Sequence, residues 1–123
     1  MADPRPTIVV VDDDAAVRAA LVFAFELDGF CVETCADAAA LRIATLPQRG
    51  CLVVDYDMPG EDALSLLKAV RHERPDFPAI LTITQPKAAV LAAARKAGIP
   101  VVEKPLLSDA LSKCIEQVLE IAP

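Results

Sequence analysis

The chain has 123 residues, a length that suits one domain. Hydrophobic residues make up 54% of it, which is enough for a sizeable core and far from the composition of a disordered chain. The net charge of −6 argues against nucleic-acid binding through a basic surface, and no apolar run is long enough to span a bilayer. The N-terminus lacks the apolar segment of a signal peptide, so we predict a cytoplasmic protein that binds neither nucleic acid nor membrane.

The sequence predicts the first strand and the first helix close to the N-terminus. Residues 1–6 are polar, carry two prolines and are expected to form a disordered lead. Thr7 to Val11 is a continuous β-branched run, which is typical of a buried strand. Three consecutive acids follow it. Asp14, the last of them, can cap a helix that ends at Gly29.

The middle of the chain repeats this alternation. Phe30 to Thr34 alternates polar and apolar residues and predicts a short strand at the edge of a sheet. Asp37 can cap a second helix, from Ala38 to Leu46. Cys51 to Val54 is an apolar run that leads straight into Asp55 and then into a Pro-Gly turn. Such a run is typical of a buried strand in a parallel sheet.

The second half of the chain predicts two more strands and three helices. Asp62 can cap the third helix, residues 79–84 predict the fourth strand, and an alanine-rich helix is expected over residues 87–97. Residues 101–102 form a short fifth strand, and Ser108 can cap the last helix. Five strands therefore alternate with five helices. We predict an α/β fold, a (βα)5 three-layer sandwich with helices on both faces of a parallel sheet.

Polar residues follow the ends of these strands. Asp12 and Asp13 follow the first strand, Asp55 ends the third, Thr84 ends the fourth and Lys104 follows the fifth. Parallel strands end at one edge of a sheet, which is where ligands bind in open α/β folds. Mg²⁺ accepts carboxylates together with a phosphate oxygen, and a lysine offers a point charge to a phosphoryl group. We therefore predict phosphoryl transfer onto a carboxylate, with Asp55 as the nucleophile.

From residue 7 to residue 121 the chain resembles the receiver domain of two-component response regulators. The similarity rests on four segments: Val-Val-Asp12-Asp13-Asp14, Val-Val-Asp55-Tyr-Asp-Met58-Pro59-Gly60, Lys96-Ala97-Gly98 and Glu-Lys104-Pro105. The resemblance implies a flavodoxin-like fold with strand order 2-1-3-4-5 and a single receiver domain over residues 7–121.

The resemblance also implies a role for each site residue. Asp55 would accept a phosphoryl group from a sensor histidine kinase or a phosphotransfer protein. Asp12 and Asp13 would hold Mg²⁺ together with Asp55 and the backbone carbonyl of Asp57, and Lys104 would bind the phosphoryl group. Such a domain takes part in a phosphorelay and signals through a downstream protein partner. It is not an enzyme, and it can form a weak homodimer.

Two positions depart from the pattern of the family. Ile83 stands where the family has Ser or Thr, and Val101 stands where it has an aromatic residue. In the family these two residues couple phosphorylation to the surface of the fourth helix, fifth strand and fifth helix. We therefore expect the signal to stay near the phosphorylation loops. Thr84 is kept as a candidate hydroxyl, since a shift of one residue would bring it into the site. The resemblance also implies a cis peptide between Lys104 and Pro105.

Two other functions stay open. A pseudo-receiver, which would act as an interaction module without a phospho-switch, agrees with Ile83 and Val101 but not with the intact acids and lysine. The segment Asp55-Tyr-Asp57 also resembles the Asp-x-Asp motif of haloacid dehalogenase-type phosphatases. In that family the motif follows the first strand, whereas here an acidic pair comes earlier in the chain. Turnover of a generic phosphomonoester would distinguish such a phosphatase from a receiver.

Overall fold

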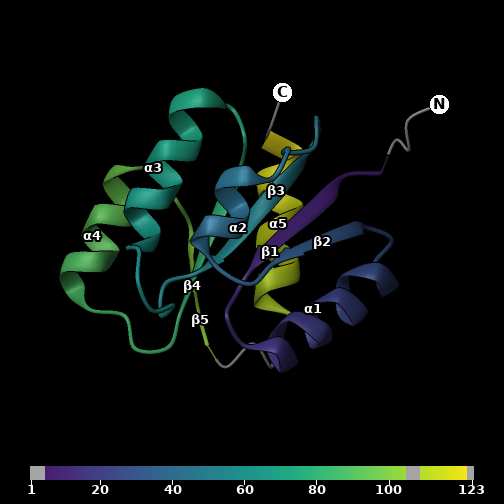
Figure 1. Cartoon of the computed structure of the whole chain (residues 1–123), viewed down its shortest axis with the longest axis horizontal. Helices are drawn as coiled ribbons and strands as arrows, with labels where there is room; N and C mark the ends of the chain where they lie inside the picture. The colour runs from purple at the N-terminus through teal and green to yellow at the C-terminus, as the bar shows by residue number, and fades with distance from the viewer. Residues whose placement is uncertain (1–4, 105–108, 122–123) are drawn as a thin grey trace.

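Five parallel strands form a single sheet in the computed structural model, which describes residues 5–104 and 109–121 (Figure 1). The strand order is β2-β1-β3-β4-β5. The strands are β1 (Thr7–Val11), β2 (Cys31–Cys35), β3 (Gly50–Asp55), β4 (Ala79–Ile83) and β5 (Val101–Glu103). The helices are α1 (Ala15–Leu27), α2 (Ala38–Ile43), α3 (Ala63–Glu73), α4 (Ala88–Lys96) and α5 (Ala110–Ile121). The predicted α/β fold, its strand order and the edge position of the second strand are confirmed.

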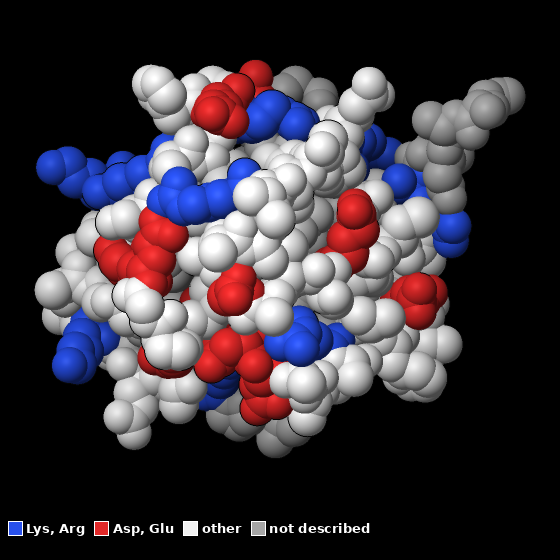
Figure 2. Space-filling model, in the orientation of Figure 1, with Lys and Arg blue, Asp and Glu red and all other residues white. Residues whose placement is uncertain are grey.

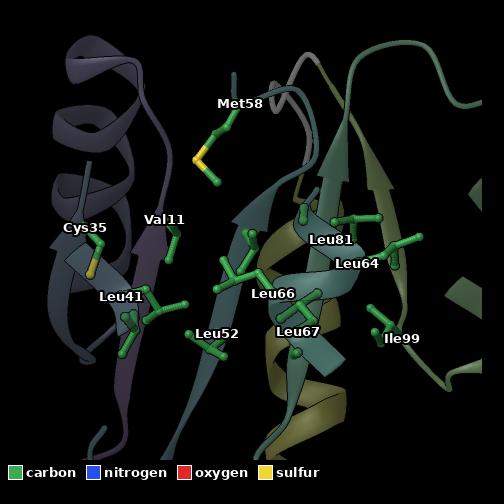
Figure 3. Close-up of a cluster of buried hydrophobic side chains, with 14 of the residues drawn as sticks. Val11, Cys35, Leu41, Leu52, Met58, Leu64, Leu66, Leu67, Leu81 and Ile99 are labelled. Carbon is green, nitrogen blue, oxygen red and sulfur yellow. The ribbon is translucent and has the colours of Figure 1, made fainter. Parts of the chain in front are cut away.

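The helices cover the sheet on both faces. One core cluster joins the sheet to α2, α3 and α4, and Leu66 and Leu67 of α3 are fully buried in it (Figure 3). The other cluster joins the opposite face to α1 and α5, with Phe25 and Ile115 at its centre. Alternate residues of a strand point to opposite faces, so the central strands must be apolar on both. This is why β3 is buried along its whole length.

Short-range contacts fix where α1 and α2 begin and where α1 ends. The Asp14 carboxylate accepts hydrogen bonds from the backbone N–H groups of Ala16 and Val17, at 2.9 and 3.3 Å, as its capping role requires. Asp37 accepts from Ala40 N–H at 2.8 Å in the same way. The chain turns at Gly29 after α1, where φ is +93°, a value that glycine adopts without strain.

Several boundaries differ from those expected. β2 begins and ends one residue later, β4 ends at Ile83, and α2 ends at Ile43 because Ala44 is extended rather than helical. Asp62 precedes α3, but its carboxylate accepts from the Ser65 hydroxyl and from no backbone N–H. The expected cap at Ser108, the Lys104–Pro105 peptide and residues 1–4 of the lead lie outside the described residues. None of the described helices combines the length and hydropathy needed to cross a membrane.

Candidate phosphoacceptor site

Three carboxylates converge at the carboxyl edge of the sheet. Asp12 follows β1 and Asp55 ends β3, and because Val11 pairs with Val54 in the parallel register, the two strand ends lie side by side. Asp12 and Asp55 are only 2% and 3% exposed, whereas Asp13 is exposed. One carboxylate oxygen from each of the three lies within 4.8 Å of the others. Figure 2 shows acidic side chains gathered at the lower edge of the molecule, where β1 and β3 end in Figure 1.

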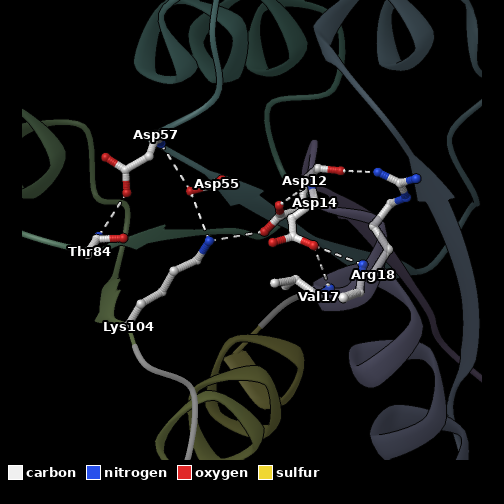
Figure 4. A network of polar contacts seen from close by, with 9 residues as sticks. Asp12, Asp14, Val17, Arg18, Asp55, Asp57, Thr84 and Lys104 are labelled. Atoms are coloured by element: carbon white, nitrogen blue, oxygen red, sulfur yellow. Dashed lines mark hydrogen bonds and ion pairs between the residues drawn. The ribbon is translucent and has the colours of Figure 1, made fainter.

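Lys104 supplies the positive charge that faces these acids. Its Nζ lies 3.1 Å from Asp12 Oδ2 and 3.3 Å from Asp55 Oδ1, so that it bridges the two buried carboxylates (Figure 4). The backbone N–H of Lys104 donates to the carbonyl of Ile83 over 2.8 Å, which continues the β4–β5 pairing to the base of this side chain. The lysine is thus held by the sheet itself and is only 17% exposed.

The pKa values of Asp55 and Lys104 are both shifted by their surroundings. Burial raises the pKa of Asp55 above its ordinary value, and the nearby charge of Asp12 raises it further, against the lowering effects of the Asp57 N–H and Lys104. Burial lowers the pKa of Lys104, but hydrogen bonding to Asp12 and the charges of Asp55 and Asp12 outweigh it, so the pKa is raised overall. Lys104 therefore stays charged at neutral pH, and a second cation at the acids would favour ionised Asp55 further.

The donor set fits a hard divalent cation. Carboxylate oxygens are the ligands that Mg²⁺ prefers, and it commonly uses one or two of them together with water and phosphate oxygens. The structure brings Asp12, Asp13 and Asp55 within the distance that such an ion needs. Asp57, whose backbone carbonyl is the fourth predicted ligand, lies in the adjoining loop, and its N–H donates to Asp55 Oδ1 over 3.0 Å.

The threonines at the end of β4 are placed differently from each other. Thr82 pairs with Asp55 in the register of β3 and β4 and is buried. Ile83 is also buried, and it shares with Leu81 and Val101 the opposite face of the sheet. Thr84 is exposed, and the contact it makes at the site is through its backbone N–H, which donates to Asp57 Oδ2 over 2.9 Å. The structure does not bring the Thr84 hydroxyl to Asp55.

Sequence reasoning missed one residue of the site. The Arg18 guanidinium donates from Nη1 to the backbone carbonyl of Asp12 over 2.7 Å (Figure 4). Arg18 lies in the first turn of α1, and its backbone N–H bonds the carbonyl of the cap residue Asp14. The sequence did contain a signal for this contact. Arg18 lies one helical turn after the cap residue Asp14, so its side chain can reach back to the acidic loop. Its contact ties the start of α1 to the acidic loop.

A parallel sheet of order 2-1-3-4-5 with acids and a lysine at its carboxyl edge is the arrangement of a receiver domain. Residues 8–116 match the family model described as response regulator receiver domain. The chain therefore belongs to the receiver-domain family of two-component response regulators, as the resemblance implied. Domains of this family are generally signalling domains rather than enzymes.

Curated relatives are regulators longer than this chain. The transcriptional regulatory protein FixJ of Bradyrhizobium diazoefficiens is 36% identical over 118 residues, which cover 94% of this chain and 57% of FixJ. The C4-dicarboxylate transport transcriptional regulatory protein DctD of Pseudomonas aeruginosa is 32% identical over 121 residues, which cover 97% of this chain and 26% of DctD. The chain thus spans little more than half of FixJ and about a quarter of DctD.

Solved structures agree with the fold. The crystal structure of FixJ-N is 30% identical, with a TM-score of 0.82 and coverage of 98% of this chain and 96% of that one. The response regulator StyR is 33% identical, with a TM-score of 0.85 and coverage of 96% and 61%. The chemotaxis protein CheY4 of Vibrio cholerae is 22% identical at a TM-score of 0.81, covering 94% and 99%, and shows the common fold alone.

Proposed function

We propose that this chain is a phosphoacceptor receiver, in which Asp55 takes a phosphoryl group from a sensor histidine kinase or a phosphotransfer protein. One observation carries the proposal. Lys104 Nζ lies within 3.3 Å of Asp55 and 3.1 Å of Asp12, so a buried carboxylate, a second acid and a fixed cation meet at one point. Structural ion pairs are usually found at the surface, whereas a buried group of this kind is typical of a functional site.

The transfer step follows from these contacts. A carboxylate oxygen of Asp55 attacks the phosphorus, the P–N bond to the donor histidine breaks, and the imidazole nitrogen keeps the electron pair. Asp55 must be ionised to attack, and Lys104 favours that state. The same lysine is placed to offset the charge on the phosphoryl oxygens as the group arrives.

The proposal includes a divalent cation, Mg²⁺, at the acidic cluster. Asp12, Asp13 and Asp55 would hold it with the backbone carbonyl of Asp57. When bound, the ion would neutralise charge between the carboxylates and the phosphoryl oxygens. Asp12 and Asp55 lie buried and already share Lys104, whereas Asp13 is exposed, so Asp13 is the acid most available to a new cation.

The surface beside the site suits a protein donor. Phe23 and Leu27 of α1 are 67% and 72% exposed, and the exposed residues between them and the acidic loop are mainly alanines. The surface over α1, at the lower right of the molecule, is mostly uncharged (Figure 2). Phe23 and Leu27 lie in the second half of α1, and the exposed alanines continue the uncharged surface back to the acidic loop. An exposed apolar face of this kind is suited to bind a protein. We propose that the donor protein contacts α1, that a downstream protein partner reads the phosphorylated state, and that the chain acts in the cytoplasm without turning over phosphomonoesters.

Intact-mass measurement tests this proposal. Incubation with a small phosphodonor and Mg²⁺ should add the mass of one phosphoryl group to the wild type and none to Asp55→Asn. Omission of Mg²⁺ should abolish the gain. Labelling of Asp55→Asn to the same extent as wild type would place the acceptor elsewhere. A wild type that gains no mass under these conditions, but folds, would instead be a pseudo-receiver, as the aliphatic residue at position 83 would allow.

A further inference from the structure

The Asp57 side chain joins two loops at the mouth of the acceptor site. The backbone N–H of Asp57 donates to Asp55 Oδ1 over 3.0 Å, and Asp57 Oδ2 accepts from the Thr84 backbone N–H over 2.9 Å. Asp55 ends β3, whereas Thr84 follows β4 and leads to α4. Figure 4 shows the two contacts in sequence, from Thr84 through Asp57 to Asp55 and Lys104. One residue therefore connects the acceptor carboxylate to the loop before α4.

Position 83 offers no alternative link of this kind. The Ile83 side chain is buried and has no group that donates a hydrogen bond. Within residues 5–104 and 109–121, the Asp57–Thr84 hydrogen bond is the one side-chain hydrogen bond or ion pair between the loop after β3 and the loop after β4. A change at the acceptor can shift a conformation only through contacts that differ between the two states. Among the described residues, this hydrogen bond is the direct side-chain contact between the two loops that can do so.

We propose that phosphorylation of Asp55 breaks the Asp57–Thr84 hydrogen bond and so releases the start of α4. This inference rests on the proposed function and adds a positioning residue to it. A phosphoryl group brings roughly two negative charges at neutral pH. It would lie next to the exposed Asp57 carboxylate, and like charges at such distances repel. Its oxygens also compete for nearby N–H donors, and the Thr84 N–H is one of them.

The start of α4 is suited to respond. α4 begins at Ala88, soon after Thr84, and its cap residue Lys87 makes no side-chain cap hydrogen bond. The first N–H groups of a helix have no partner within the helix, so an uncapped start is held only by its packing. Ala88, Ala89 and Leu91 in this first part of α4 are exposed. Release of Thr84 would therefore change the path of residues 84–87 and the first turn of the helix.

Two alanine variants distinguish the loss of the Asp57–Thr84 hydrogen bond from the mere loss of a negative charge. Asp57→Ala removes the acceptor of the Thr84 N–H. Asp62→Ala is the matched control, because it removes another exposed carboxylate of the same β3–α3 loop, one that bonds Ser65 and not Thr84. The readout is the set of backbone amide chemical shifts of Thr84 and residues 88–90, recorded without Mg²⁺ and without any phosphodonor. The reference is wild type with Mg²⁺ and beryllofluoride, a phosphoryl mimic.

The resting Asp57→Ala protein should already resemble the wild type bound to beryllofluoride. We expect its amides at Thr84 and residues 88–90 to move more than half of the way from the resting to the beryllofluoride-bound positions. Its Thr84 amide should also exchange with solvent at least several times faster. Asp62→Ala should leave both readouts at the wild-type resting values. Thermal melting establishes that both variants are folded before the spectra are compared.

Each outcome decides one of the two claims. Resting shifts of Asp57→Ala that coincide with those of resting wild type, or that move no more than those of Asp62→Ala, would overturn the release mechanism. If Asp57→Ala does not fold, the same test is made with Asp57→Ser, which also removes the carboxylate that accepts from Thr84. A wild type that gains no phosphoryl mass and shows no beryllofluoride shifts would instead reject the proposed function, and the mechanism with it.

Discussion

Lys104 Nζ lies 3.3 Å from Asp55 Oδ1, although Lys104 follows β5 and Asp55 ends β3. β4 lies between those two strands, so the lysine side chain reaches across the end of β4 to the acceptor. The hydrogen bond from Lys104 N–H to the Ile83 carbonyl holds the base of that side chain in position. The positive charge that faces Asp55 therefore comes from a residue far away in the chain.

Loss of this lysine should destabilise the protein in a pH-dependent way. Because burial raises the pKa of Asp55 above its ordinary value of 3.8, the folded state binds this proton more tightly than the unfolded state. The free energy of unfolding therefore falls as pH rises from 3.8 through the raised pKa. Lys104→Met removes two effects that lower this pKa, so the fall should be larger and extend to higher pH. We expect a loss of about 3 kcal/mol at neutral pH, measured by urea unfolding without Mg²⁺.

A surface lysine provides the control for that measurement. Lys113 pairs with Asp109 at 3.1 Å, but both side chains are exposed. Lys113→Met should change the free energy of unfolding by no more than about 0.5 kcal/mol at any pH. If both variants lose the same stability with the same pH profile, the buried pair has no special role in the fold.

Asp55→Asn should stabilise the protein that it inactivates. The raised pKa of Asp55 means that the folded state disfavours its charge, and the neutral amide removes that charge while keeping the shape of the side chain. At neutral pH and without Mg²⁺, the free energy of unfolding should therefore exceed that of wild type, and the gain should vanish below pH 3.8. Chemical unfolding over a pH series measures this. A less stable variant at neutral pH would show that ionised Asp55 is favoured by the fold.

Mg²⁺ binding should depend on Asp13 and not on Asp14. Asp13→Asn removes one of the three clustered carboxylates, and we expect at least a tenfold loss of Mg²⁺ affinity, or about 1.4 kcal/mol. Asp14→Asn is matched in charge, and asparagine caps helices as well as aspartate does, so this variant should bind Mg²⁺ like wild type. Titration followed by amide chemical shifts gives both affinities. Equal affinities in the two variants would place the ion elsewhere.

A hydroxyl at position 83 should widen the response to phosphorylation. Ile83→Thr places a donor where the receiver family has one, and beryllofluoride should then shift amides of β5 that do not respond in wild type. The buried hydroxyl should cost about 1–3 kcal/mol of stability when no phosphoryl group is bound. Ile83→Val, which stays aliphatic, should cost only about 0.5–1.5 kcal/mol and leave the range of shifted amides unchanged. An unchanged range in Ile83→Thr would contradict a role for the hydroxyl.

The sequence patterns predicted the alternation of strands and helices and the residues of the acidic cluster, and the resemblance to receiver domains supplied the strand order. Apolar runs such as that of β3 and cap residues such as Asp14 and Asp37 are local signals, because burial and capping act within a few residues. Parallel strands end at one edge of a sheet, so the sequence predicts that Asp12, Asp55 and Lys104 lie close together.

The contacts made by individual side chains needed the tertiary structure. Asp62 precedes a helix just as Asp14 does, yet its carboxylate bonds Ser65, since the choice between nearby donors depends on loop geometry. Thr84 contributes its backbone N–H rather than its hydroxyl, and the carboxylate that accepts it belongs to Asp57. Segments far apart in the chain meet there, and their separation and orientation are decided by the packing of the helices against the sheet, which no local pattern encodes.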